Sequence, residues 1–263
     1  MGTRSGASRA ERSRILRLHR RRTRERERLV LVEGIRAVAE ALKRGARVRL
    51  AVRSARLLEL EGGAALAQAL DAGAEVVVVD DRELVELSAT ESPQGVLLVV
   101  DEPADVPPDP SAGLLLVLDR IQDPGNVGAL IRSARGLGAG GIVALDGTAD
   151  LWSAKAVRGS AGTGFGARMC RMDLEDWLGW VERNDVELLI ADAEGVPVGD
   201  RTLGRGPVAL VLGNEGSGVR AATAAAATGR VSIPLADGVE SLNVAVAGSL
   251  LLHALLRAAE AQG

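Results

Sequence analysis

The feature that most constrains this chain is the alternation of short apolar runs with segments of helical periodicity. Apolar runs of this kind are typical of strands that are covered on both faces of a sheet. They occupy residues 29–33, 48–52, 76–79, 96–100, 114–118, 142–145, 187–191, 208–212 and 231–233. Helical spacing lies between them, at residues 35–43, 64–70, 126–137, 174–183 and 243–259. The alternation predicts an α/β fold, with a mostly parallel sheet covered by helices in the C-terminal half.

A proline-rich segment interrupts the alternation once. Residues 101–111 read DEPADVPPDPS and contain four prolines in eleven residues. Proline at this density cannot continue a helix or a central strand. We therefore expect a linker at 101–112, between a small α/β domain at 29–100 and a larger domain at 113–263.

The first 28 residues carry a strong positive charge. They hold eleven arginines and three glutamates, a net charge of +8, whereas the whole chain is −3. We expect a basic arm at 1–28 that contacts phosphates, with Arg20, Arg21, Arg22 and Arg24 as candidate RNA contacts. A solubilising disordered tail is the alternative. Aromatic residues make up only 2% of the chain, so contacts to the RNA backbone and shape are favoured over base stacking.

Composition excludes several other classes of protein. Cys170 is the single cysteine and there are two histidines, so neither an internal disulfide nor a Cys- or His-rich metal site is expected. No apolar run approaches the roughly 18 residues of a membrane span, and the charged N-terminus lacks the apolar core of a secretory signal. A cytoplasmic protein that binds no metal and no membrane is the expectation.

Three loops follow predicted strands directly, at the edge where open α/β sheets bind ligands. They are 119–132 (DRIQDPGNVGALIR), 213–218 (GNEGSG) and 233–243 (IPLADGVESLN). Glycines in the second loop allow positive φ and close approach of a ligand. Taken singly, each loop also fits an ordinary capped helix or a glycine turn.

Polar side chains in these loops are the candidate functional groups. Asn126 is expected to cap the helix that follows it, and Arg132 lies six residues further on. Glu215 is a carboxylate in a loop of otherwise small residues. Ser241 or Glu240 is expected to cap the final helix, with Asn243 in its first turn.

Together, in this order, the three loops resemble the motifs of the SpoU/TrmH family of RNA 2′-O-ribose methyltransferases. The segment KAVRGSAG at 155–162 resembles a further family segment, whereas GFGAR at 164–168 departs from the apolar residue and proline that usually follow it. The resemblance covers about 114–256. Residues 13–100, above all RERERLVLVEGIRAVAE at 24–40, resemble the L30e-like substrate-binding domain of many members.

The resemblance implies a C-terminal trefoil knot of the SPOUT type and a homodimer, with the final helix in its interface. It implies that S-adenosyl-L-methionine binds to the second and third loops, at Leu212, Gly213, Asn214, Gly216, Ile233, Leu235, Leu242 and Asn243. It also implies RNA contacts at Lys155 and Arg158. The expected substrate is structured RNA, with 23S ribosomal RNA favoured. The alternatives are a tRNA 2′-O-methyltransferase and a catalytically silent RNA-binding protein of the same fold.

The catalytic residues implied by the resemblance are Arg132, Asn126, Glu215, Ser241 and Asn243. A guanidinium is not deprotonated in proteins, so Arg132 is expected to clamp a phosphate and stabilise developing charge rather than act as a base. Asn126 would hold the ribose or Arg132, and Glu215 would orient Arg132. Ser241 and Asn243 would fix the substrate phosphate and the cofactor loop.

Overall fold

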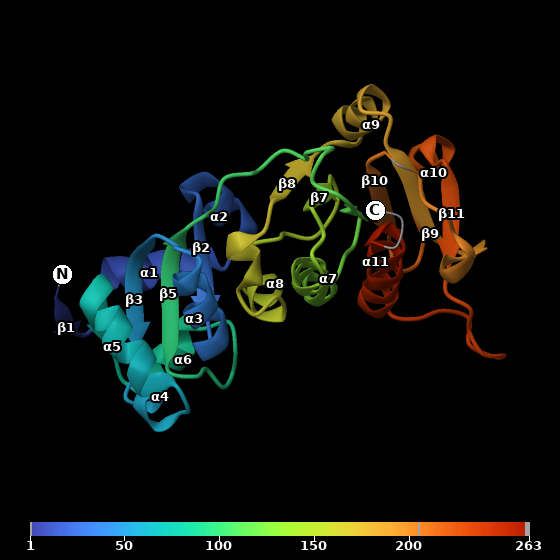
Figure 1. Cartoon of the computed structure of the whole chain (residues 1–263). Coiled ribbons are helices and arrows are strands. Elements are labelled where there is room, and N and C mark those ends of the chain that lie inside the picture. Colours follow the sequence, from blue (N-terminus) through green and yellow to red (C-terminus); the bar gives the residue numbers. More distant parts are fainter. Residues whose placement is uncertain (1, 205, 261–263) are drawn as a thin grey trace. The chain divides into compact units, whose positions relative to one another are not determined.

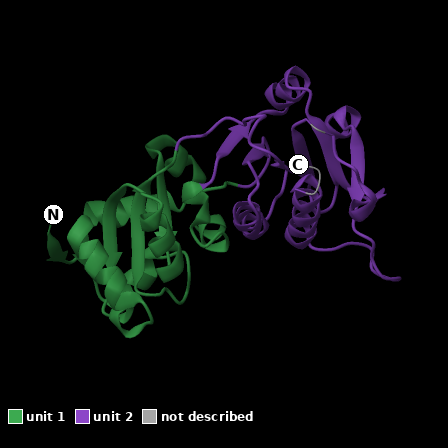
Figure 2. Cartoon of the chain, in the orientation of Figure 1, with its two compact units in different colours: residues 1–103, 150–166 green, residues 104–149, 167–263 purple. Residues whose placement is uncertain are grey.

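A computed structural model describes residues 2–204 and 206–260. The chain forms two compact units, which are described separately (Figure 2). Unit 1 comprises residues 1–103 and 150–166, and unit 2 comprises residues 104–149 and 167–263. No helix or strand lies between residues 102 and 114. The expected domain boundaries therefore need two corrections, one at residues 1–28 and one at residues 150–166.

Unit 1 is built on a five-stranded sheet of order β1-β4-β3-β5-β2 (Figure 1). The strands are β1 (Thr3–Ser5), β2 (Leu29–Glu33), β3 (Val48–Arg53), β4 (Val76–Val78) and β5 (Val96–Asp101). The helices are α1 (Arg9–Leu18), α2 (Arg21–Glu27), α3 (Ile35–Lys43), α4 (Arg56–Glu59), α5 (Gly63–Gly73), α6 (Asp81–Leu87) and α8 (Ala154–Gly159), with a 3-10 helix at Thr163–Gly166. β1, β4 and β3 are parallel, and β5 is antiparallel to β3 and to β2.

Residues 2–28 are folded into unit 1, so the expectation of a separate basic arm is wrong. β1 pairs with β4. α1 begins with a capping box formed by Ser8 and Glu11. Ile15 and Leu18, three residues apart on one face of α1, are fully buried in the core of the unit. Two apolar positions thus anchor a helix whose composition is dominated by arginine.

Residues 150–166 belong to unit 1 and not to the methyltransferase-like half in which they were expected. Asp150 forms a buried ion pair with Arg24, with Nη2 and Oδ2 2.5 Å apart. A Cβ at Gly162, whose φ is +80°, would lie 2.5 Å from the Ala37 carbonyl oxygen, so α3 packs closely against this position. The aromatic ring in the divergent GFGAR segment packs on buried Trp152, with ring centroids 5.0 Å apart.

Unit 2 contains a six-stranded, entirely parallel sheet of order β11-β9-β10-β6-β7-β8. The strands are β6 (Leu115–Asp119), β7 (Gly141–Leu145), β8 (Met169–Met172), β9 (Glu187–Pro197), β10 (Val208–Gly213) and β11 (Gly229–Ser232). The helices are α7 (Pro124–Leu137), α9 (Leu174–Arg183), α10 (Ala221–Ala226) and α11 (Val244–Glu260), with a 3-10 helix at Val198–Asp200. The parallel sheet predicted for this half is confirmed.

Helices cover both faces of this sheet. Trp177 of α9, 0% exposed, packs in one core cluster with alternate strand residues such as Leu115 and Val211. On the other face α7 and α11 lie side by side (Figure 1). Gly248 of α11 allows close packing, because a Cβ there would lie 2.6 Å from Cδ2 of Leu130 on α7 and 2.3 Å from Cδ1 of Leu212 on β10. α11 therefore rests directly on β10, the strand that leads into the second loop.

Candidate active site

A cavity of about 710 Å³ lies beside the carboxyl ends of β9 and β10. Its lining comes from the end of β9, the glycine-rich loop after β10, and residues 231–235 and 239–244. The residues expected to bind a cofactor are brought together here, because Leu212, Gly213, Asn214, Ile233, Leu235, Leu242 and Asn243 all line the cavity. Gly216 belongs to the same loop but is not part of the lining. Asp192 and Pro197 of β9 also line it, although the sequence pattern ended that strand at residue 191.

A chain of side-chain hydrogen bonds joins the three loops. Nδ2 of Asn126 donates to Oε1 of Glu215 at 3.0 Å, and Oδ1 of Asn126 accepts from Nδ2 of Asn243 at 3.1 Å. The partners are separated in sequence by 89 and 117 residues. The fold thus brings three of the five expected catalytic residues into direct contact. Within this chain Glu215 orients Asn126, and no hydrogen bond or ion pair with Arg132 is found in the described residues.

The helix caps at this site differ from those expected. Asp123 caps α7 by accepting from the Gly125 amide, and Pro124 takes the first helical position, so Asn126 lies inside the first turn. Asn243 is itself the residue that accepts from the first amides of α11, at 2.9 Å from Ala245 and 3.3 Å from Val246. Neither Ser241 nor Glu240 has this role. Because Asn126 does not cap the helix, both the oxygen and the nitrogen of its side-chain amide can bond to the two other loops.

The Glu215 carboxylate is held in its ionised form. Burial by itself would raise its pKa, but hydrogen bonds from the Asn126 side chain and from backbone amides, including those of Gln122 and Asp123, outweigh burial and lower the pKa. Glu215 is therefore a hydrogen-bond acceptor at neutral pH and not a proton donor.

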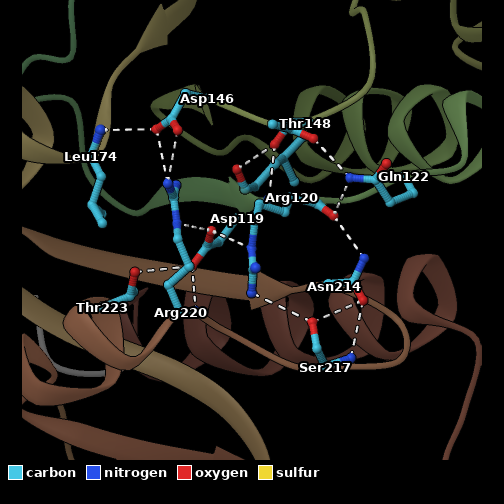
Figure 3. Close-up of polar contacts among 12 residues, drawn as sticks. Asp119, Arg120, Gln122, Asp146, Thr148, Leu174, Asn214, Ser217, Arg220 and Thr223 are labelled. Atoms are coloured by element: carbon cyan, nitrogen blue, oxygen red, sulfur yellow. Dashed lines mark hydrogen bonds and ion pairs between the residues drawn. The ribbon is translucent and has the colours of Figure 1, made fainter.

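A polar network around the buried Asp119 was not revealed by the sequence patterns (Figure 3). Asp119, at the end of β6, is 0% exposed. Its Oδ1 accepts from Nε of Arg220 at 2.7 Å, and its Oδ2 accepts from the Arg220 amide at 2.8 Å and from Oγ1 of Thr223 at 2.9 Å. Nη1 of Arg220 also reaches both oxygens of Asp146, each at 2.9 Å. The carboxyl ends of β6 and β7 are thereby joined to the start of α10, where the glycine-rich loop ends.

Asn214 fastens the other end of that loop. Its Nδ2 donates to the Arg120 carbonyl at 3.1 Å, and its Oδ1 accepts from the amides of Gly216 and Ser217, each at 3.0 Å (Figure 3). Arg120 has a φ of +62°, a left-handed conformation that is costly for a residue with a side chain. Gln122 donates to the same Arg120 carbonyl at 3.2 Å. The loop that carries Glu215 is therefore fixed at both ends.

The other two expected catalytic residues make no such contacts. Arg132 is exposed on α7, and among the described residues it has no hydrogen-bond or ion-pair partner. Ser241 is exposed and lines the cavity. An unpaired guanidinium close in sequence to Asn126 is a group able to bind an anion.

The expected RNA contacts are not all accessible. Arg24 was wrongly placed among them, because it is 5% exposed and its guanidinium is consumed by Asp150 and by the carbonyls of Leu18 and His19. Arg20, Arg21 and Arg22 are exposed. Two further candidates lie on α8 of unit 1 and are exposed: Lys155, and Arg158, whose Nη1 is 4.0 Å from Oε2 of Glu33.

Among the described residues, no group of three or more His, Cys, Asp or Glu side chains could hold a metal ion. None of the described helices has the length and apolar character needed to cross a membrane.

The model of the SpoU rRNA methylase family matches residues 113–253, and the model of the MRM3-like substrate binding domain matches residues 13–98. The chain belongs to the SpoU rRNA methylase family. The family and the substrate-binding domain expected from the three loops and from residues 13–100 are confirmed.

Characterised relatives cover nearly the whole chain. RlmP of Bacillus subtilis (strain 168), a 23S rRNA (guanosine(2553)-2′-O)-methyltransferase, is 30% identical over 90% of this chain and 92% of its own. The 23S rRNA (uridine(2479)-2′-O)-methyltransferase of Streptomyces viridochromogenes is 31% identical over 90% of this chain and 85% of its own.

Solved structures agree with this assignment. The SpoU methyltransferase AviRb from Streptomyces viridochromogenes, in complex with AdoMet, superimposes with a TM-score of 0.83 at 29% identity, covering 95% of this chain and 98% of that one. An AdoMet-bound rRNA methyltransferase from Sinorhizobium meliloti gives 0.81 at 27% identity, with 97% and 98% covered. The SpoU type of α/β fold predicted from the sequence is confirmed, while the trefoil knot itself stays a prediction.

Proposed function

We propose that this protein transfers a methyl group from S-adenosyl-L-methionine to a ribose 2′-hydroxyl of 23S ribosomal RNA. The observation that carries the proposal is the hydrogen-bond chain Glu215–Asn126–Asn243 at the edge of the cavity. These hydrogen bonds link the three family motifs through side chains that are expected to be catalytic. Relatives of this protein that have a similar length methylate 23S rRNA.

The cavity fits S-adenosyl-L-methionine in size and chemistry. Its volume of about 710 Å³ lies in the range of small-molecule sites, which are mostly apolar with a few directing polar groups. Leu212, Leu242 and Leu251 supply apolar surface, and residues 213–214 and 232–235 bring backbone to the wall. Glu240 adds a carboxylate, which suits a ligand that carries a sulfonium and an ammonium group.

The bound cofactor would supply an activated methyl group, so the chain has to orient the reacting hydroxyl and stabilise its oxygen while the hydroxyl proton leaves to water. Arg132 would bind the neighbouring phosphate and stabilise negative charge on the 2′-oxygen, since its guanidinium has no other partner among the described residues. Asn126 would orient the ribose with its second N–H. Glu215 and Asn243 fix the rotamer of that amide.

The proposal includes a homodimer in the cytoplasm. Val246 and Leu250 of α11 are 50% and 48% exposed and lie four residues apart on one helix face. A second copy of the chain packed on this face would cover them. Sedimentation equilibrium tests this point: a monomer at micromolar concentration would contradict it.

The decisive experiment is methyl transfer from labelled S-adenosyl-L-methionine to rRNA and tRNA that lack the modification. We expect 2′-O-methyl incorporation into 23S rRNA, abolished by Arg132→Ala and strongly reduced by Arg132→Lys, because an ammonium cannot form the two parallel bonds of a guanidinium. Near-normal turnover of Arg132→Lys would refute the clamp.

The same assay tests the two alternative functions. Incorporation into tRNA alone would establish a tRNA methyltransferase. Calorimetry that detects no cofactor binding by the intact protein would point to a silent RNA-binding protein of this fold.

A further inference from the structure

A shallow hollow of about 650 Å³ lies along the outer face of α1 in unit 1. We call it the α1 hollow; it is lined by Ala7, Arg9, Arg12, Ser13, Leu16, Arg17 and Arg20. From Arg9 to Arg17 these positions recur every three or four residues, so they share one face of α1. Ile15 and Leu18 occupy the opposite face and are fully buried. The hollow is therefore the solvent-facing side of a helix whose other side is fixed in the core.

The eleven arginines of residues 4–28 fall into two classes. Seven have an acidic partner: Arg4, Arg12, Arg14, Arg21, Arg24, Arg26 and Arg28. The guanidinium groups of the other four make no hydrogen bond and no ion pair within 4.0 Å among the described residues: Arg9, Arg17, Arg20 and Arg22. The pKa of Glu27 is lowered by its hydrogen bond from Arg14, and the charge of Arg17 also contributes. The surplus of positive charge in this segment is thus concentrated on a few side chains.

Three of those four unpartnered arginines line the α1 hollow: Arg9, Arg17 and Arg20. Arg9 and Arg17 are eight residues apart, about 12 Å along α1, and Arg20 follows as the N-cap residue of α2, so the cations form a row and not a single point. Leu16, 48% exposed, lies between them. A row of guanidinium groups around an exposed apolar side chain suits a polyanion with apolar surface between its charges.

We infer that the α1 hollow binds the phosphate backbone of the RNA substrate, with Leu16 against a ribose or base; the inference rests on the proposed function. Guanidinium groups bind phosphate through two parallel hydrogen bonds, and unpaired arginines give up no internal ion pair when they do so. The matched substrate-binding domain includes this helix from residue 13. The sequence pattern predicts phosphate contacts from residues 20–24, but Arg21 is paired and Arg24 is buried. We therefore assign the phosphate contacts to Arg9, Arg17 and Arg20.

The test measures binding of the full-length protein to unmodified 23S rRNA transcript across a range of salt concentrations. The variant carries Arg9→Gln, Arg17→Gln and Arg20→Gln. Its matched control carries Arg4→Gln, Arg14→Gln and Arg26→Gln, which removes the same charge from arginines that already have acidic partners. Because these side chains lie on the surface, both variants are expected to keep the wild-type melting temperature and cofactor affinity.

Each lost phosphate contact lowers the slope of log affinity against log salt by about 0.7–0.9. For the hollow variant, which lacks three such contacts, we expect the magnitude of this slope to fall by about 2 and the affinity for RNA to fall at least tenfold. The control should stay within about threefold of wild type, with its slope changed by less than about 0.5. Leu16→Ala should weaken binding without changing the slope. Equal losses in the hollow and control variants, or no loss in either, would overturn the inference.

The inference and the proposed function can fail separately. If wild type methylates 23S rRNA and the hollow variant binds and methylates it equally well, the hollow is not the RNA contact and the proposed function stands. If the slope falls as expected but no RNA is methylated, the hollow binds RNA and the proposed function fails.

Discussion

Asp119→Asn is the substitution with the clearest consequence for unit 2. The side chain is fully buried and accepts three hydrogen bonds, two from Arg220 and one from Thr223. Asparagine removes the charge, keeps a single acceptor oxygen and turns an NH₂ group toward other donors. The guanidinium of Arg220, whose side chain is 17% exposed, then loses its buried counter-charge.

The expected loss of stability depends on which partners Arg220 keeps. Removing one partner of a buried ion pair costs about 3–5 kcal/mol. Arg220 keeps both oxygens of Asp146, so we take the lower end, about 3 kcal/mol. For a domain of roughly 150 residues this corresponds to a fall in Tm of about 6–12 °C.

Asp146→Asn is the matched control. It breaks the other half of the Arg220 pair, but Asp146 is 55% exposed, and exposed pairs contribute about 0–1 kcal/mol. Its amide oxygen can still accept from the Leu174 backbone. We expect a change in Tm below about 4 °C.

Scanning calorimetry, together with titration of S-adenosyl-L-methionine into each variant, checks both expectations. Weaker cofactor binding should accompany Asp119→Asn, because the network holds one end of the loop that lines the cavity. If both variants lose equal stability, or if Asp119→Asn lies within about 1 kcal/mol of wild type, the buried-pair reasoning is wrong.

Three further predictions concern other parts of the chain. Arg24→Gln leaves Asp150 buried without its cation and should cost about 3–5 kcal/mol in thermal unfolding; unchanged stability would contradict it. Gly248→Ala places a Cβ 2.3 and 2.6 Å from leucine side chains of β10 and α7. Overpacking costs about 1–3 kcal/mol and outweighs the gain of about 1 kcal/mol from replacing glycine in a helix, so the variant should be less stable. A urea midpoint higher than that of wild type would refute this packing argument. For Glu215, whose pKa is lowered, the hydrogen bonds to the ionised form stabilise the fold above the unfolded pKa and are lost as pH falls through the folded pKa. Its carboxyl ¹³C titration should therefore have a midpoint below 4.5, and Asn126→Ala should raise it.

The pattern of the sequence was sufficient for the parallel sheet and for the three loops. Short continuous apolar runs rich in valine, such as 208–212, favour a strand that is covered on both faces. In unit 2, one strand and one α-helix escaped the same reasoning. Residues 169–172 (MCRM) are too short and too mixed to be recognised as β8, and the alanine-rich segment of α10 has no polar face.

The site was predicted as a set of residues and not as a network. The positions of the three loops predicted that Asn126, Glu215 and Asn243 lie at one edge of the sheet. The hydrogen-bond partners of each side chain depend on rotamers that are fixed by tertiary packing. Asp119 offered a usable signal, because a carboxylate directly after a buried strand needs a partner. That partner, Arg220, lies 101 residues away, beyond any local pattern.

Residues 150–166 belong to unit 1 although they interrupt the sequence of unit 2. Separating the two units would therefore require three cuts in the chain rather than one. A single cleavage near residue 103 would leave Trp152, Phe165 and Asp150 attached to unit 2 without the surroundings that bury them. Unit 1 would meanwhile keep the Arg24 guanidinium without its counter-charge. Replacement of unit 1 in this chain therefore has to carry the 150–166 segment along with residues 1–103. The two compact units of this chain are therefore interleaved in sequence and are not consecutive segments.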